Sequence, residues 1–402
     1  MLLALLASNV LVVAPTAGPG VDFTSIQAAI DTAASGDIVL VRAGTYGESI
    51  AIPAPGKSLS IVGDAAIPPR IRGLLDFGGV AAEHVIALRG LELAGVVFEP
   101  PATQPTVRIG AGTLLVEDCN ITGSRSGIQA FSSRWTGVTR CTIRATSTAL
   151  YQLPPLFSYA VQGLAVGAEQ PGSTLTIHAS SIFGAPAVKE LAVMGFYGAP
   201  GREAVNSATQ LLVSRTALTG GDGLPTSYYS FGLCVPHDPG PGLSYTGSSH
   251  VLASTIHAGA SGLTSPPCPQ PQPVPDIIGA IPSLLGGDSP VLGATPVVRE
   301  GQTLHVSLES TPNDYAFVFV ASSMQPQWVD AYVGVLAGQI GQLFALGTVG
   351  AAGSASGSAT ILDLGAGVEG AVVYLQGASI DPATLSVRLS NVSVATLLDA
   401  GL

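Results

Sequence analysis

The chain has 402 residues, a formal net charge of −11 and an unusually low charged fraction of 10%. Its 47% hydrophobic content argues against general disorder, and its length predicts two or more domains. The acidic balance argues against nucleic-acid binding, which needs a basic surface, and against attachment to anionic membranes.

The first residues are apolar. The segment MLLALLAS, residues 1–8, carries no basic residue and is too short to span a membrane. We interpret it as the remnant of a signal peptide, which predicts an extracellular or cell-surface protein; the alternative is a buried first strand beginning at Met1. The following VLVVAP, residues 10–15, is predicted to be a strand.

A short amphipathic helix is predicted over residues 24–34. Thr24 is the expected N-cap and Gln27 the closing residue of a capping box, and Gly36 is expected to end the helix. One face is apolar and carries Ile26, Ala29, Ile30 and Ala33. Three apolar strands are predicted next, at 38–41, 49–52 and 58–62.

The wording of this region, DFTSIQAAID followed by VRAGTY, resembles the N-terminal cap of pectin methylesterases in the pectin lyase-like superfamily. The resemblance implies a right-handed parallel β-helix whose first coil is covered by the helix. It is specific for the fold rather than for the chemistry.

Irregular internal repeats continue this pattern. Alternating apolar segments align on Leu93, Val116, Val138, Ile177, Val213 and Val251, with steps of 23, 22, 39, 36 and 38 residues. A step near 22 predicts one three-strand coil, and the longer steps predict coils with inserted loops. We therefore expect an all-β protein with a parallel β-helix over residues 9–285, including a Pro-rich linker at 264–275.

The predicted insertions, 151–160, 194–203 and 221–232, interrupt comparable places, and aromatic residues are concentrated in them. Aromatic faces stack on sugar rings, which makes a polysaccharide the candidate partner. Two alternatives remain open: the rings fasten the loops to the helix wall, or they form a patch for a protein partner. The candidate ligand-binding residues are Tyr151, Tyr159, Phe196, Tyr197, Tyr228 and Tyr229.

Four cysteines are present, without a CxxC pair that would indicate zinc. Cys234 and Cys268 are the candidate disulfide, because they flank an irregular Pro-rich loop. Cys119 and Cys141 are expected at equivalent positions of successive coils, either stacked or bridged. No metal ion or cofactor is expected.

The resemblance to methylesterases places their two aspartates at positions that here hold Ser126 and Thr148. A hydroxyl cannot replace either carboxylate, so methylesterase activity is expected to be absent. Glu117 and Asp118 are adjacent and are expected to point to opposite faces of a strand. His237, beside Asp238, is interpreted as a loop hydrogen-bonding residue. The favoured function is a non-catalytic protein that binds polysaccharide; the alternative is a polysaccharide lyase or hydrolase with an unrecognised site on the loop face.

The pattern changes near the C-terminus. Residues 286–402 contain alternating strands separated by turn signals, which predicts a small β-sandwich. Its last segment, VVYLQGASIDPATLSVRLSNVSVATL, resembles C-terminal modules of secreted bacterial β-helix proteins. The oligomeric state is not predicted.

Overall fold

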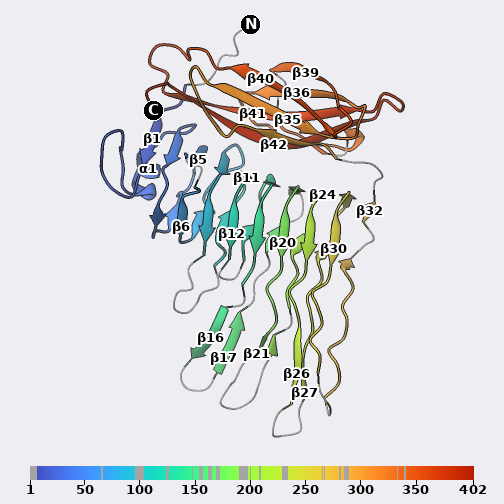
Figure 1. Ribbon diagram of the computed structural model, residues 1–402. Coiled ribbons are helices and arrows are strands. Elements are labelled where there is room, and N and C mark those ends of the chain that lie inside the picture. The colour runs from blue at the N-terminus through green and yellow to red at the C-terminus, as the bar shows by residue number, and fades with distance from the viewer. Residues whose placement is uncertain are drawn as a thin grey trace.

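The computed structural model describes residues 7–402, except 65–66, 96–103, 124–125, 147, 154–156, 162–164, 169–172, 190–197, 200, 208–209, 229–233, 265, 267, 280–281, 285–288, 333 and 339–340. Three parallel sheets wind around one axis, and an antiparallel domain lies across one of them (Figure 1). The architecture is the predicted right-handed parallel β-helix followed by antiparallel sheets.

Each coil visits the three sheets in turn. The first sheet contains β1 (Val10–Val13), β2 (Ile38–Val41), β5 (Leu59–Gly63), β8 (Val85–Arg89), β11 (Thr113–Glu117), β14 (Trp135–Thr139), β19 (Thr174–His178), β24 (Gln210–Ser214), β29 (Ser249–Leu252) and β32 (Ser283–Leu284). The second contains β3 (Thr45–Tyr46), β6 (Arg70–Arg72), β9 (Glu92–Ala94), β12 (Asn120–Thr122), β15 (Thr142–Arg144), β20 (Ser181–Phe183), β25 (Ala217–Thr219) and β30 (Thr255–His257). The third contains β4 (Ile50–Ala51), β7 (Leu75–Phe77), β10 (Val107–Ile109), β13 (Ile128–Ala130), β18 (Val166–Ala168), β23 (Val205–Ser207), β28 (Leu243–Tyr245) and β31 (Ile277–Gly279).

The cap helix α1 (Ile26–Thr32) covers the start of the core, and Ile26 and Ile30 are fully buried as predicted. The predicted capping is wrong in detail. Ser25, not Thr24, is the N-cap, and its hydroxyl accepts from the Ala28 amide at 3.3 Å. Glu48 completes the cap by accepting from the Ile26 and Gln27 amides at 2.8 and 3.1 Å. A carboxylate distant in sequence therefore replaces the expected local box.

The far end of α1 also differs from the prediction. The helix ends at the C-cap Ala33, three residues before Gly36. Lys57 donates from Nζ to the Ile30 and Ala33 carbonyls at 2.7 and 2.5 Å, which satisfies the last turn and places a positive charge at the negative end of the helix dipole. Gly36, with φ of 99°, forms the turn into β2.

The predicted coil alignment holds for five of its six positions: Val116, Val138, Ile177, Val213 and Val251 are successive register partners in the first sheet. The sixth, Leu93, is wrong. It pairs with Ile121 in the second sheet, and Leu88 is the residue beside Val116. Both strands of that coil alternate apolar residues, so the sequence pattern does not distinguish them.

A left-handed corner follows six successive strands of the first sheet. The corner residues have φ between 43° and 66° and are Gly90, Asp118, Arg140, Ala179, Arg215 and Ala253. The amides of the first five form one ladder, each donating to the carbonyl of the last residue of the next coil's strand, from Gly90 to Glu117 (3.1 Å) through to Arg215 and Leu252 (3.1 Å). Non-glycine residues adopt this left-handed conformation at a cost in free energy, which the hydrogen bonds of the ladder offset.

The residue after each corner forms an internal column: Leu91, Cys119, Cys141, Ser180, Thr216 and Ser254. Each hydroxyl or thiol after Leu91 donates to a carbonyl two residues earlier, as Cys141 does to Thr139 at 3.1 Å and Ser180 to His178 at 2.8 Å. The Ser180 hydroxyl also accepts from the Cys141 amide at 3.1 Å. Cys119 and Cys141 lie at equivalent positions, as predicted, and both are buried free thiols.

After β32 the chain becomes antiparallel. One sheet has the order β33 (Val291–Ala294), β35 (Thr303–Glu309), β40 (Ser354–Thr360). The other has the order β34 (Val297–Arg299), β42 (Val387–Leu398), β41 (Gly370–Ile380), β36 (Tyr315–Ala321), β39 (Gln342–Thr348), with β34 parallel to β42. A ribbon of β37 (Gln327–Val329) and β38 (Gly334–Leu336) flanks the 3₁₀ turn η1 (Asp330–Tyr332).

This antiparallel domain covers the outer face of the first sheet (Figure 1). Leu115 and Trp135 point outward and pack in one cluster with Met324, Val335 and Val392. A second cluster joins the outward residues of β1 and β2 to Leu398. Strands β5, β8, β11 and β14 are consequently buried along their whole length.

Candidate functional site

Three hairpins project from the β-helix on the side away from the antiparallel domain (Figure 1). They are β16–β17 (Thr148–Leu153 and Phe157–Val161), β21–β22 (Val188–Lys189 and Gly198–Ala199) and β26–β27 (Leu224–Tyr228 and Cys234–His237). Each is inserted between the second-sheet and third-sheet strands of successive coils, as the sequence predicts for insertions at one place. Neighbouring hairpins contact one another, so the three form a continuous hairpin layer.

The base of the hairpin layer is built by close backbone packing. Four amides link the arms of the insertions in series: Arg202 donates to Ala185, Gly221 to Arg202, Gly240 to Gly221 and Gly259 to Gly240, at 2.9, 2.8, 2.8 and 2.9 Å. A Cβ added at Gly221 would lie 1.7 Å from the Ala185 oxygen, and one at Gly240 would lie 2.3 Å from the Arg202 oxygen. These glycines are therefore required by the approach of neighbouring chains, which fixes the spacing of the hairpins.

Carboxylates fasten the same base. Asp222 accepts from the Ala260 amide at 2.8 Å, Asp238 from the Gln272 amide at 2.9 Å, and Asp276 from the Ala258 amide at 2.7 Å. Each bond joins chain segments at least 18 residues apart. Each of these carboxylates therefore holds two separate chain segments together at the base of the hairpin layer.

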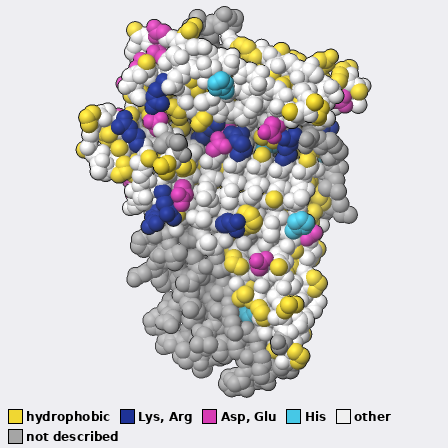
Figure 2. Space-filling model, viewed as in Figure 1, with side chains coloured by type: hydrophobic (Ala, Val, Ile, Leu, Met, Phe, Trp, Pro, Cys, Tyr) yellow, Lys and Arg dark blue, Asp and Glu magenta, His cyan; other side chains and the backbone are white. Residues whose placement is uncertain are grey.

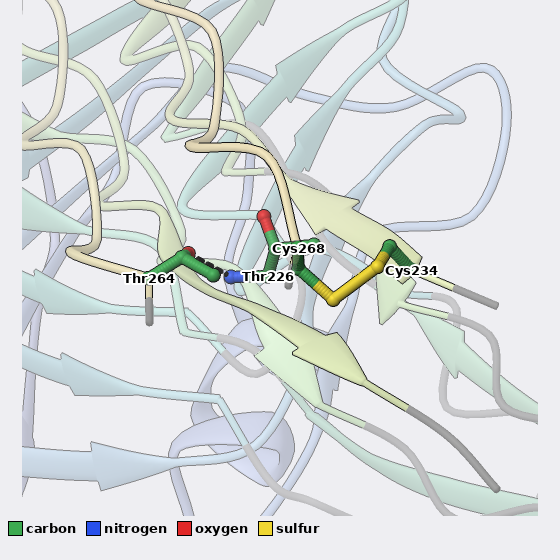
Figure 3. Close-up of a disulfide and its surroundings, with 4 residues drawn as sticks. All are labelled: Thr226, Cys234, Thr264 and Cys268. Atoms are coloured by element: carbon green, nitrogen blue, oxygen red, sulfur yellow. Dashed lines mark hydrogen bonds between the residues drawn. A yellow bond between two sulfur atoms is a disulfide. The ribbon is translucent and has the colours of Figure 1, made fainter. Parts of the chain in front are cut away.

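A disulfide closes the last hairpin against the Pro-rich linker (Figure 3). It joins Cys234 and Cys268, the pair singled out in the sequence, with a Cα–Cα distance of 5.5 Å. Beside it, the Thr226 amide donates to the Thr264 hydroxyl at 2.6 Å (Figure 3). His237, in β27, is fully buried. The linker and β26–β27 are thereby held as one unit.

The predicted ligand-binding aromatics that the structure describes lie on two of the three hairpins. Tyr151 and Tyr159 are register partners across β16–β17, and Tyr228 is the register partner of Cys234. The structure thus brings the backbones of these positions into one layer. Phe196, Tyr197 and Tyr229 lie outside the described residues.

The two positions that match the methylesterase aspartates follow β12 and β15, neighbouring strands of the second sheet. Ser126 is buried in the turn before β13, where its carbonyl accepts from the Thr106 amide at 2.8 Å. Thr148 begins β16 and pairs with Val161 in the hairpin layer. One lies in a short coil turn and the other on an insertion, and both positions hold a hydroxyl in place of a carboxylate.

A buried charge network between the β-helix and the antiparallel domain was not predicted. Arg89 and Glu117 are 1% and 2% exposed and lie 3.3 Å apart. Glu117 also accepts from Arg140 at 2.5 Å, from the Ser393 hydroxyl at 2.6 Å and from the Val394 amide at 2.9 Å. It therefore joins two β-helix cations to strand β42.

Asp118 corrects the expectation that adjacent carboxylates point apart. Its left-handed φ of 54° ends the strand alternation, and both Glu117 and Asp118 reach Arg140, at 2.5 and 2.7 Å. Burial alone would raise the pKa of Asp118, but the hydrogen bonds and charge of Arg140, with Arg89 adding to them, hold that pKa below its usual value. The sequence signal for this pairing was Arg140, a positively charged residue one coil away in an otherwise charge-poor chain.

The arginines of this network also bind carbonyls of the antiparallel domain. Arg140 donates to Leu292 at 2.7 Å, and Arg89 donates to Ala294 at 2.5 Å and to Val394. Figure 2 shows charged side chains gathered in a band where the two parts meet, with a sparsely charged surface on either side. The charged side chains of the network hold the antiparallel domain against the β-helix, because each of them already pairs with another member of the network or with a backbone group.

Comparisons with known proteins give the following. No protein-family model and no curated protein matches the sequence. Among solved structures, pectin methylesterase from carrot is similar at 14% identity and a TM-score of 0.35, covering 63% of this chain and 84% of that one. ORF18 of Geobacillus virus E2 is similar at 13% identity and a TM-score of 0.28, covering 92% of this chain and 72% of that one.

The class of the protein is defined by its own sheets: a parallel β-helix with a docked antiparallel domain and a lateral hairpin layer. Among the described residues, none of the helices has the length and apolar character needed to cross a membrane. Within the same residues, no group of three or more His, Cys, Asp or Glu side chains is arranged to hold a metal ion.

Proposed function

We propose that this chain is an exported, non-catalytic protein of the extracellular space or cell surface that binds a neutral polysaccharide on its hairpin layer. The observation that carries the proposal is the common origin of the three hairpins, which leave successive coils at the same corner and lie against one another. Repetition along the helix axis produces an extended surface, which suits a polymer better than a small molecule.

The rigid base of the layer supports this function. Glycine packing, carboxylate clamps and the disulfide fix the hairpins before any ligand arrives. A prearranged surface loses less conformational entropy on binding, so a modest contact area gives useful affinity. Tyrosines at three positions of the layer provide the chemistry for stacking on sugar rings.

Two further features support the ligand class and the location. The formal net charge of −11 opposes an acidic polymer, which favours a neutral glycan. A disulfide persists in oxidising compartments, in agreement with export.

The test is a glycan array probed with the full chain, followed by affinity measurements on the best polysaccharide. Replacing Tyr151, Tyr159 and Tyr228 together by Ala is expected to weaken binding at least tenfold, or about 1.4 kcal/mol. Tyr332→Ala is the matched control, because Tyr332 is an exposed tyrosine (39%) of the antiparallel domain. Unchanged affinity of the triple variant, or the absence of any bound glycan, would contradict the proposal.

The same polysaccharides are then incubated with the protein and assayed for new reducing ends and unsaturated products. The proposal expects none above a heat-inactivated control. Sustained product release would replace it with the alternative, a polysaccharide lyase or hydrolase acting on the loop face. Glu203, whose carboxylate is paired with Arg202 at 3.3 Å, would be the first described carboxylate to substitute in that case.

A further inference from the structure

A pocket of about 380 Å³ lies at the end of the antiparallel domain where two turns meet. The turn before β36 and the turn between β41 and β42 form its walls. The lining residues are Thr311, Pro312, Asn313, Asp314, Ser379, Asp381, Pro382, Ala383, Ser386 and Arg388. None of them belongs to the hairpin layer.

The first argument for a ligand is an unpartnered hydroxyl in this pocket. Ser379 is 1% exposed, lines the pocket, and its Oγ has no hydrogen-bond partner among the residues that the structure describes. A buried hydroxyl without a partner costs free energy, which a ligand that hydrogen-bonds to it would recover. Ser379 is also the register partner of Arg388, so a cation lies on the adjacent strand.

The second argument is the mixture of donors and acceptors around Ser379. Tyr315 pairs with Ile380 at the end of β36 and β41, and the next residue of each turn, Asp314 and Asp381, lines the pocket. Thr384 and the Ala383 amide donate to Asp381, and with the charge of Arg388 they lower the pKa of this carboxyl. Asp381 is therefore ionised at neutral pH and accepts hydrogen bonds.

The geometry points to a binding site for a neutral sugar residue, separate from the hairpin layer and independent of the function proposed above. Sugar hydroxyls both donate and accept, so they match two carboxylates, an arginine and a serine hydroxyl in one small pocket. A bare divalent cation matches less well, because Arg388 lies in the same pocket and Asp381 already accepts two hydrogen bonds.

The experiment uses the full chain and four separate probes, D-glucose, D-galactose, D-mannose and N-acetyl-D-glucosamine, with calcium chloride alone as a fifth. Binding is followed by saturation-transfer NMR for the sugars and by calorimetry for all five. At least one sugar is expected to bind. Ser379→Ala should weaken that binding at least fivefold, and Asp381→Asn should do the same.

Matched controls are available in the same domain. Thr396 is fully buried with an unpartnered hydroxyl but lies outside the pocket, so Thr396→Val should leave sugar binding unchanged. Asp363, like Asp381, accepts from the amide two residues later, at 2.7 Å, so Asp363→Asn controls for the turn. The triple tyrosine variant of the hairpin layer should keep full sugar binding.

The inference is overturned if none of the four sugars binds, if calcium binds and the sugars do not, or if Ser379→Ala and Asp381→Asn bind as the parent does. It is upheld if the pocket variants alone lose binding. Loss in the hairpin variant with retention in the pocket variants would support the proposed function and reject this site.

Discussion

Arg89 and Glu117 form an ion pair at 3.3 Å with both side chains almost completely buried, at the surface where the β-helix meets the antiparallel domain. Each ion has other partners: Arg89 binds the Ala294 and Val394 carbonyls, and Glu117 binds Ser393 and the Val394 amide. Because water is excluded here, removing Glu117 leaves Arg89 and Arg140 to share the single carboxylate of Asp118, which does not compensate two cations.

Glu117→Ala is accordingly expected to lower the free energy of unfolding by about 3–5 kcal/mol. Urea unfolding followed by tryptophan fluorescence measures this directly, since Trp135 and Trp328 both lie in the cluster between the two parts. The control is Glu92→Ala, because Glu92 pairs with Arg70 at 3.2 Å with side chains 36% and 40% exposed. An exposed pair contributes at most about 1 kcal/mol, so equal effects of the two changes would contradict the docking role.

His178 predicts a pH dependence of stability. It is 2% exposed on the outer face of the first sheet, and burial lowers its pKa from 6.5 to about 4. The neutral form is favoured in the folded state, so the unfolded chain binds more protons between pH 6.5 and 4. Stability from this residue is complete above pH 6.5 and is lost as the pH falls toward 4, by at most about 3 kcal/mol.

The measurement is the free energy of unfolding from pH 7.5 to 4.5 for the parent and for His178→Gln. The variant should show a smaller loss over this range, whatever its absolute stability. Gln302→Ala, at an exposed position of the antiparallel domain, removes no titratable group, serves as the control and should keep the parent's pH dependence. Parallel curves for the parent and His178→Gln would rule out this titration.

The β-helix could be read from the sequence because its determinants are local. Alternating apolar residues recur at each coil, and Ile26 and Ile30 mark the cap helix. Leu93 was misplaced because two strands of one coil carry similar patterns, and only pairing separates them. Glu48 was missed as a helix cap because its partners are more than 20 residues away.

The candidate site was predictable only in part. The insertions are visible as interruptions of the repeat, and the hairpin layer follows from their common position. The Arg89–Glu117 network was not predictable, because it depends on how the antiparallel domain lies on the first sheet. Ser379 gives no sequence signal either, since its burial without a partner is a property of three packed strands.

The internal column predicts how Cys119 and Cys141 behave. The equivalent positions of later coils hold Ser180, Thr216 and Ser254, so Cys141→Ser should cost less than about 1.5 kcal/mol in urea unfolding. Burial, with Cys119 adding to it, raises the pKa of the Cys141 thiol well above its usual value. A thiol reagent at pH 8 should therefore label neither cysteine in the folded protein and two thiols per chain in urea. Rapid labelling of the folded chain would show that the reagent reaches the thiols of the internal column, which would contradict their burial.

The Cys234–Cys268 disulfide should stabilise the hairpin layer more than the rest of the molecule. It closes a loop with a sequence separation of 34 residues, which corresponds to about 3–4 kcal/mol in the chain-entropy treatment. In the double variant Cys234→Ser, Cys268→Ser we expect the first protease cleavage within 224–275, because the linker and β26–β27 lose their covalent connection. The hydrogen bond from the Gln272 amide to Asp238 remains. The pairing of β19 with β24 in the first sheet does not involve the disulfide, so hydrogen exchange in these strands should be unchanged.

The control is Cys119→Ser, which alters the internal column but not the hairpin layer, and should give the parent's cleavage pattern. Equal loss of exchange protection in the hairpin layer and in the first sheet of the double variant would mean that the disulfide supports the whole β-helix rather than the layer.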